Sequence, residues 1–303
     1  MSKKIATRYR SYSLSFTRLI TTLAMVFCLT SVAQASTWTT SAEGLQNSIN
    51  QARDGDTIQV TGGSTRSQIT VNKRLTIEGQ GNHTLSGMML VRASGSVIRN
   101  LTFRNVSTRA RNASIFLNGA DGARVENNDI ARSRGMGIFV GSSDNVRVTG
   151  NRVYDTRCMQ GSSGYTTSQG IKIGQRSKRV IVTNNKVEGL ESCALVAAFY
   201  CDTGGTDGVF GKNRVSRAGT GSKDAIGVYV ESRCHNWDVV DNIISDVETG
   251  VRNGSRSTGD PNNTLIEGNF IIAEEVGVKI VRGNNIIVTN NDIEAPTEIL
   301  DLR

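Results

Sequence analysis

One short phrase recurs seven times between residues 125 and 293. An apolar residue is followed three positions later by asparagine, and two positions after that by another apolar residue. The copies are spaced 22–34 residues apart, at Asn128, Asn151, Asn185, Asn213, Asn242, Asn269 and Asn291. A recurring unit of this size is typical of a solenoid, in which each repeat packs only against its neighbours.

A second phrase, about 12 residues earlier, accompanies most of the asparagine phrases. It consists of glycine followed by apolar residues at alternate positions, and this period of two predicts β-strands. The copies are GMGIFVG (135–141), SQGIKIG (168–174), AIGVYVES (225–232), ETGVRNG (248–254) and EVGVKIV (275–281). Short strands without intervening helices predict an all-β parallel β-helix of roughly eight or nine coils, stacked at the ordinary strand spacing. Leucine-rich repeats and propellers fit less well, because their consensus residues are absent.

The repeated asparagines are expected to be structural. Asparagine tolerates the left-handed backbone conformation of a tight bend, and its amide bonds neighbouring groups there. Stacked at one position in successive coils, these amides can form a hydrogen-bonded ladder. The alternative is a direct role in chemistry.

The start of the repeat region reads as a helix followed by a strand. Residues 41–53 place Leu45, Ile49 and Ala52 on one helix face, with Ser41 as the N-cap. A strand is expected at residues 57–60. A helix in this position would cover the exposed end of the sheet stack.

Residues 1–35 have the pattern of a Sec-type signal peptide, namely a basic stretch, an apolar run and the small-residue site Ala33-Gln34-Ala35. We therefore expect export to the periplasm or the medium and a mature β-helix domain at 36–303. No later segment is apolar enough to cross a bilayer. Five of the 35 basic residues and none of the 27 acidic residues precede Ser36, so the mature net charge falls from +8 to about +3. This low value argues against nucleic acid as a partner.

Four cysteines remain in the expected mature chain: Cys158, Cys193, Cys201 and Cys234. An even number in an exported protein favours two disulfides. Three pairings are compatible with the sequence, and four free buried thiols are the alternative.

The segment from Leu45 to Val60, with its Gly-Asp-Thr-Ile turn, and the repeated phrases after it resemble the pectate-lyase-like β-helix superfamily. The resemblance covers essentially the whole mature chain. It implies a single-chain right-handed parallel β-helix with a short N-terminal capping helix. Because members include polysaccharide lyases, glycoside hydrolases, uronan epimerases and noncatalytic surface proteins, the fold leaves the activity open.

Aligning the glycine phrases places one outward residue of each coil in a single row, about 5 Å from the next. The row comprises Phe116, Phe139, Lys172, Tyr200, Tyr229, Arg252 and Lys279. Its aromatic rings are expected to stack on sugars and its cations to pair with carboxylates or sulfates. Phe139, Tyr200 and Lys279 are the candidate substrate-binding residues. The alternative is that these are ordinary residues of a solvated sheet.

Cleavage of a uronan by β-elimination needs a group that neutralises the substrate carboxylate, a base and a proton donor. Tyr229 or Lys172 is the candidate base, and Arg252 or Arg233 the candidate carboxylate partner. His235 is a further catalytic candidate, with a structural role as its alternative. The phrase GIKIG and the triplet Arg233-Cys234-His235 resemble an alginate and chondroitin lyase family. The coil between them, CALVAAFYCD, has no Lys or Glu where that family carries Lys and acidic calcium ligands.

No motif specifies a cofactor. The acidic pairs Glu126/Asp129 and Asp238/Asp241 carry the oxygen ligands that Ca²⁺ prefers, with solvated turn acids as the alternative. The leading hypothesis is an exported β-helix protein that binds an acidic, uronate-containing polysaccharide and cleaves it by β-elimination. Its rival is a noncatalytic structural or adhesive module of the cell envelope. The oligomeric state is left open.

Overall fold

The computed structural model describes residues 34–107, 113–160, 166–219, 221, 224–231, 233–255 and 259–303. Within it, Ser36–Arg303 forms one compact unit. The expected signal peptide falls outside the described residues except for Gln34 and Ala35. Among the described elements all but one are strands, and the exception is helix α2 (Leu45–Gln51).

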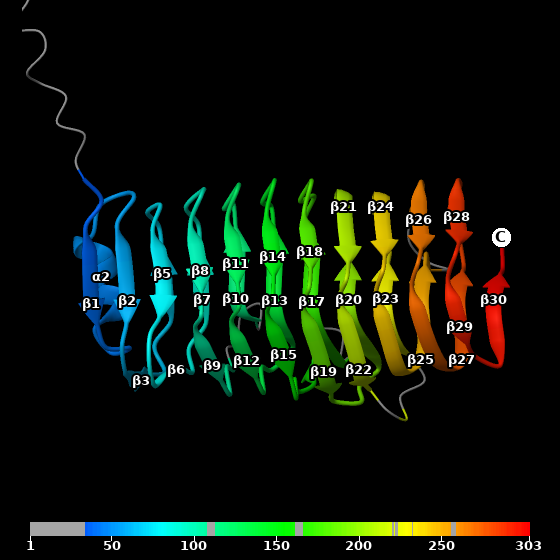
Figure 1. Ribbon diagram of the computed structural model, residues 1–303, viewed down its shortest axis with the longest axis horizontal. Coiled ribbons are helices and arrows are strands. Elements are labelled where there is room, and N and C mark those ends of the chain that lie inside the picture. The colour runs from blue at the N-terminus through cyan, green and yellow to red at the C-terminus, as the bar shows by residue number, and fades with distance from the viewer. Residues whose placement is uncertain are drawn as a thin grey trace, which may run out of the picture. The chain divides into compact units, whose positions relative to one another are not determined.

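One sheet of 11 parallel strands, here called the first stack, follows the chain order from one end of this unit to the other (Figure 1). Its members are β1 (Thr37–Thr40), β2 (Thr57–Val60), β5 (Thr76–Gly79), β8 (Val97–Arg99), β11 (Arg124–Glu126), β14 (Arg147–Thr149), β18 (Ile181–Thr183), β21 (Thr206–Gly211), β24 (His235–Val240), β26 (Thr264–Glu267) and β28 (Ile286–Thr289).

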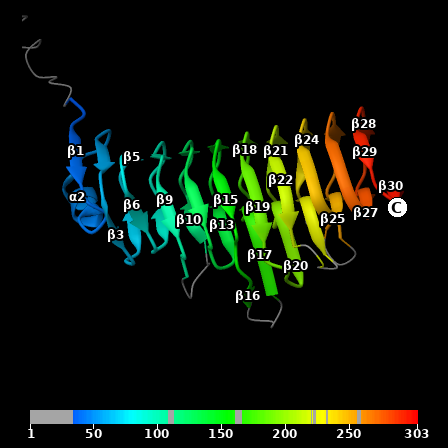
Figure 2. The ribbon, with the colours of Figure 1, turned by 60° about the horizontal axis from the view of Figure 1, so that its bottom comes forward.

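The other 19 strands are joined as one sheet, within which two further stacks can be followed (Figure 2). The second stack contains β3 (Gly63–Thr65), β6 (His83–Leu85), β9 (Thr102–Arg104), β12 (Asp129–Ala131), β15 (Arg152–Tyr154), β19 (Lys186–Leu190), β22 (Arg214–Ala218) and β29 (Asp292–Glu294). The third stack contains β4 (Ile69–Val71), β7 (Met89–Val91), β10 (Ala113–Asn118), β13 (Met136–Gly141), β17 (Thr166–Gly174), β20 (Leu195–Cys201), β23 (Ala225–Val230) and β30 (Thr297–Asp301). The long strands β25 (Ile243–Asn253) and β27 (Phe270–Ile280) run through both stacks, and β16 (Met159–Gln160) pairs antiparallel with β17.

From β2 onward each coil passes through the three stacks in turn and pairs in parallel with its neighbour, so the unit is a parallel β-helix as the sequence predicts. The expected eight or nine coils are too few, because the first stack has 11 strands. The asparagine phrases undercount the coils because those of β1, β2, β5 and β8 do not carry one. In the coil of β8, Leu101 lies where the ladder would continue, and its N–H donates to Asn128 Oδ1 (3.0 Å).

The core forms from residues that occupy the same inward position in successive coils. In the first stack Ile98, Val125, Val148, Val182 and Phe210 are in direct register, and each is fully buried. Because the side-chain period of a strand is two, a shift of one residue would turn this whole column outward. Burial of the column therefore fixes the register of the coils.

The asparagines form the predicted ladder. From Asn128 to Asn269, each backbone N–H and each Nδ2 donates to Oδ1 of the asparagine in the next coil, over 2.8–3.1 Å. The side chains from Asn128 to Asn269 are about 1% exposed. A buried amide costs free energy unless it is hydrogen-bonded, and the ladder bonds both ends of each amide.

Helix α2 packs against β1, β2 and β4 at the N-terminal end of the stack (Figure 1). It begins at Leu45 rather than at 41, with Gly44 as N-cap and no side-chain capping bond, so the expected Ser41 cap is wrong. Leu45 and Ile49 are buried, and the Gln46 amide exchanges two hydrogen bonds with the backbone of Thr70. The helix thus satisfies groups at the edge of β4 that would otherwise lack a strand partner.

Two disulfides connect neighbouring coils. Cys158 is bonded to Cys193, and Cys201 to Cys234, with sequence separations of 35 and 33. The expectation of two disulfides is confirmed, and the structure selects one of the three pairings. Cys201 and Cys234 are fully buried, whereas Cys158 and Cys193 are half-buried.

Candidate functional site

The third stack aligns the outward row that the sequence predicts. Strand pairing places its residues in continuous direct register, including Tyr200, whose coil has an irregular spacing. The order is Phe116, Phe139, Lys172, Tyr200, Tyr229, Arg252 and Lys279. We refer to this set as the outward row.

The aromatic members of the outward row stack on one another. Phe116 and Phe139 lie 4.9 Å apart with planes 5° apart, and Tyr200 and Tyr229 lie 5.1 Å apart with planes 19° apart. All four side chains are at most 5% exposed. The expectation that these ring faces receive sugars is therefore wrong, because the strand spacing also suits ring stacking and neighbouring rings occupy the faces.

Two cations of the outward row, Lys172 and Arg252, are held by aromatic rings and carboxylates. Lys172 Nζ lies 4.9 Å from the centroid of Tyr200 and 2.9 Å from Asp202 Oδ2. Arg252 lies over the ring of Tyr229 at 5.0 Å, and its Nη1 is 3.2 Å from Asp224 Oδ1. The buried Nε of Arg252 has no hydrogen-bond acceptor among the described residues. A buried donor without an acceptor is uncommon in folded proteins, which marks Arg252 as a candidate ligand-binding residue.

Both tyrosine hydroxyls converge on Glu231, which directly follows β23. Tyr200 Oη donates a short hydrogen bond to Glu231 Oε2, and Tyr229 interacts with Glu231 and Ser255. Burial is the main cause that raises the pKa of Tyr200 and of Tyr229, and the negative charge of Glu231 raises both further. The phenols therefore keep their protons at neutral pH. Tyr229 in its protonated form cannot serve as the expected base.

Glu248 on β25 is a carboxyl group that the sequence analysis missed. Burial, together with the charges of Glu275 and Asp224, raises its pKa to about 7, against a hydrogen bond from the Ala225 N–H that lowers it. A carboxyl group poised near neutral pH is a candidate proton donor. The signal was present in the sequence, because Glu248 opens the phrase ETGVRNG and Glu231 ends the segment AIGVYVE.

Arg233 and His235 lie off the outward row. Arg233 is exposed in the turn after β23, and its N–H donates to the carbonyl oxygen of Gly259 (3.2 Å). His235 begins β24 in the first stack, opposite Thr206, and its Nδ1 accepts the N–H of Asn262 (3.2 Å). The structure thus places Lys172, Tyr229 and Arg252 in one row but does not add Arg233 or His235 to it.

Residues 86–293 match the family model described as the right-handed β-helix region. The chain belongs to this family. The match establishes that the parallel β-helix is right-handed, as the resemblance implies. No curated protein sequence matches this β-helix protein.

Two solved structures show how widely the fold is shared. An alginate lyase from Paenibacillus sp. str. FPU-7 is 13% identical with a TM-score of 0.55, over 88% of this chain and 98% of that one. The tailspike protein of E. coli bacteriophage HK620, solved with a pentasaccharide, is 14% identical with a TM-score of 0.62. That alignment covers 84% of the β-helix protein and 54% of the tailspike chain, so this chain spans about half the tailspike length. At such identities the likeness concerns the fold.

The acidic pairs proposed for calcium are not brought into clusters. Glu126 lies in the first stack and Asp129 in the second, where the carboxylate of Asp129 is ion-paired with Arg104. Burial, and secondarily the charge of Glu267, raises the pKa of Asp238. Within the described parts of the chain, no group of three or more His, Cys, Asp or Glu is arranged to hold a metal ion, and no helix is long and apolar enough to cross a membrane.

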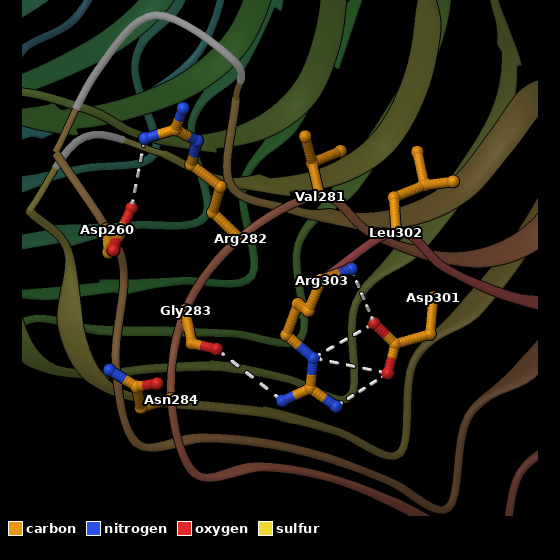
Figure 3. Close-up of a pocket in the computed structure, with 8 residues that line it drawn as sticks. All are labelled: Asp260, Val281, Arg282, Gly283, Asn284, Asp301, Leu302 and Arg303. Atoms are coloured by element: carbon orange, nitrogen blue, oxygen red, sulfur yellow. Dashed lines mark hydrogen bonds and ion pairs between the residues drawn. The ribbon is translucent and has the colours of Figure 1, made fainter.

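Two surface hollows formed by described residues differ in whether their arginines are ion-paired. A hollow of about 680 Å³ contains two arginines, Arg282 and Arg303, each paired with an aspartate, as Figure 3 shows. A smaller hollow of about 310 Å³ is lined by Asn105, Val106, Ser107, Arg132, Arg134, Arg157, Cys158 and Glu191. Its three arginines form no ion pair within the described residues.

Proposed function

We propose that this β-helix protein binds a polysaccharide along the outward row and cleaves it. The observation that carries the proposal is the buried network in which Tyr200 and Tyr229 share Glu231, beside an Arg252 donor that has no protein acceptor. Perturbed titratable groups with an unused buried donor are characteristic of functional sites. The names of the two fold relatives, an alginate lyase and a tailspike solved with a pentasaccharide, support a polysaccharide as the ligand.

The first candidate reaction is β-elimination on a uronate-containing chain. Arg252 Nε is the donor that we assign to the substrate carboxylate, and Tyr229 is the acid that protonates the leaving oxygen. Lys172 is ion-paired with Asp202, so its use as base would leave Asp202 without that partner. We therefore assign the removal of the proton next to the carboxylate to Glu231, which both phenols contact.

Hydrolysis is a second candidate, favoured by the pKa of about 7 at Glu248. In this reaction the protonated Glu248 donates to the glycosidic oxygen, and Asp224 accepts a proton from the attacking water. Carboxyl groups whose environments separate their pKa values commonly divide these two roles. Asp224 also forms the ion pair with Arg252, which links the two candidate reactions to one part of the row.

The test is a product analysis on a panel of uronate-containing and neutral polysaccharides. Elimination yields shortened chains with the ultraviolet absorbance of an unsaturated uronate, whereas hydrolysis yields new reducing ends without it. We expect cleavage that is lost in Tyr229→Phe if the reaction is elimination and in Glu248→Gln if it is hydrolysis. Binding without cleavage would favour the noncatalytic adhesive or structural module. If no polysaccharide is bound or cleaved, the proposal fails.

Export is part of the proposal, supported by the signal-peptide pattern of residues 1–35 and by the two disulfides. We expect the protein isolated from the periplasm or the medium to begin at Ser36. N-terminal sequencing of each cell fraction tests this. Recovery of an uncleaved chain with reduced cysteines from the cytoplasm alone would contradict it.

A further inference from the structure

The hollow of about 310 Å³, here called the arginine hollow, lies where successive coils turn from the second stack into the third. Arg132 and Arg134 lie between β12 and β13, and Arg157 occupies the same turn one coil later. Arg134 and Arg157 form a parallel β-bridge, which fixes these two turns side by side. The turn with Arg132 and Arg134 leads into β13, which carries Phe139 of the outward row, and Arg157 precedes β16, which pairs with β17.

The charge of the arginine hollow is not neutralised by the protein. Three arginines face one carboxylate, Glu191, and Glu191 Oε2 already accepts the N–H of Cys158 (2.6 Å). The guanidinium groups of Arg132 and Arg157 make no hydrogen bond or ion pair within the described residues, and Arg134 Nε donates only to the carbonyl oxygen of Cys158 (3.4 Å). Most of the donors on these three side chains are therefore free to bind an anion.

Two cations of the outward row, Lys172 and Arg252, differ in this respect, whereas Lys279 forms no ion pair within the described residues. Lys172 is ion-paired with Asp202 and Arg252 with Asp224, so an anion that binds there must compete with a protein carboxylate. The hollow with Arg282 and Arg303 is neutralised in the same way, by Asp260 and Asp301. Of the paired sites and the two hollows, the arginine hollow is the one whose positive charges form no ion pair with a carboxylate of the described residues.

One disulfide fixes part of the wall of the arginine hollow. The disulfide between Cys158 and Cys193 joins the turn that contains Arg157 to the turn that contains Glu191. A site whose side chains are mounted on linked turns loses less conformational freedom when a ligand binds. Its volume of about 310 Å³ lies at the lower end of the range for small-ligand pockets, about 300–1,000 Å³.

We propose that the arginine hollow binds the sulfate or carboxylate group of an acidic polysaccharide whose chain continues over the outward row. The inference rests on the proposed function for the presence of a polysaccharide, and adds which part of the surface recognises its charge. Planar guanidinium groups bind both kinds of oxyanion through paired hydrogen bonds. Recognition of charge and cleavage of the chain are thereby assigned to different residues.

The experiment measures the binding of three hexasaccharide probes by calorimetry at low and high NaCl. The probes are a heparin-derived hexasaccharide, which carries sulfates and carboxylates, an oligouronate, which carries carboxylates alone, and neutral maltohexaose. The test variant is Arg132→Gln/Arg157→Gln. The matched control is Arg124→Gln/Arg147→Gln, which removes the same charge from the first stack of the same two coils. Circular dichroism shows whether each variant is folded.

We expect the test variant to bind at least one acidic probe about tenfold or more weakly, because lost charge-assisted hydrogen bonds typically cost that much. The control should bind within about twofold of the native protein, and added salt should weaken native binding more than that of the test variant. Preference for the heparin probe or for the oligouronate identifies the anionic group. Equal losses in test and control variants, or equal affinity of the native protein for maltohexaose and the acidic probes, would overturn the assignment.

The test of the arginine hollow and the test of the proposed function can fail independently, because the first measures binding and the second measures cleavage. Loss of acidic-probe binding in Arg132→Gln/Arg157→Gln supports the arginine hollow even when no polysaccharide is shortened. Cleavage of an acidic polysaccharide that is unchanged in rate and in KM by the same variant would overturn the arginine hollow and leave the proposed function intact.

Discussion

Tyr200 and Tyr229 occupy the same position on β20 and β23, and their rings stack with centroids 5.1 Å apart. Because the two hydroxyls lie side by side, both reach the single carboxylate of Glu231. The stacked rings hold two protonated phenols in fixed positions, and do not offer their faces to a sugar. The chemistry of the outward row is therefore expected at the polar ends of its side chains.

Tyr229→Phe is expected to abolish most cleavage while the protein remains folded. The ring stack with Tyr200 is retained, and loss of one buried hydrogen bond typically costs about 1 kcal/mol of the free energy of unfolding. Loss of a general acid lowers the rate by about 10²–10⁴-fold. Rate measurements and chemical denaturation separate the two effects. Tyr200→Phe is the control, since it also removes a hydroxyl from Glu231. An equal loss of cleavage rate in Tyr200→Phe would show that the rate depends on Glu231 rather than on the proton of Tyr229.

The pKa of about 7 at Glu248 makes the free energy of unfolding depend on pH. The folded-state value lies above the ordinary 4.5, so the protonated group favours the folded state. This contribution is complete below pH 4.5 and is lost as pH rises through about 7. Urea denaturation at pH 4.5, 6 and 8 should show the native protein losing stability relative to Glu248→Gln as pH rises. A difference between the two proteins that does not change with pH would refute the assignment.

Asn213→Ala should destabilise the protein strongly. The variant removes an amide that is 1% exposed and leaves the donors of Asn185 without their acceptor, at about 1–3 kcal/mol for each unsatisfied group. Asn291→Ala is the matched control at the last position of the ladder. Its side chain is half-buried, so water can replace part of what is lost. Thermal and urea denaturation should give a clearly larger loss at Asn213, and similar losses would contradict the account of the ladder.

The two disulfides should differ in their sensitivity to reductants. Cys158 and Cys193 are half-buried, whereas Cys201 and Cys234 are fully buried, and reduction requires access to sulfur. Under mild reduction of the folded protein, alkylation followed by mass spectrometry should label Cys158 and Cys193 first. Labelling of Cys201 and Cys234 at the same rate would mean that the coils open at that point.

The repeated phrases were enough to predict the β-helix, the asparagine ladder and the outward row. These features follow from a period that each coil repeats, so one phrase fixes the register of the next. The number of coils was underestimated because the N-terminal coils lack the asparagine phrase, and that of β8 buries Leu101 at the ladder position. Their strands are as regular as the others, but their sequence lacks the asparagine phrase from which the coils were counted.

The details of the candidate site depended on distances that the sequence does not contain. The pKa of Glu248 depends on burial and on Asp224 and Glu275, which come from neighbouring coils. Likewise, the pairing of Lys172 with Asp202 and of Arg252 with Asp224 joins residues about 30 positions apart. The ring faces of Tyr200 and Tyr229 were expected to be open because each was considered in its own coil. Only the stacked structure shows that they cover each other.

A crystal structure of Tyr229→Phe with an uncleaved acidic oligosaccharide tests the central claim most directly. The variant retains the ring stack and is expected to bind the chain without cleaving it. The account predicts sugar units over Lys172, Arg252 and Lys279, with a substrate oxygen at Arg252. An oligosaccharide bound to the first stack, or to no part of the outward row, would contradict it.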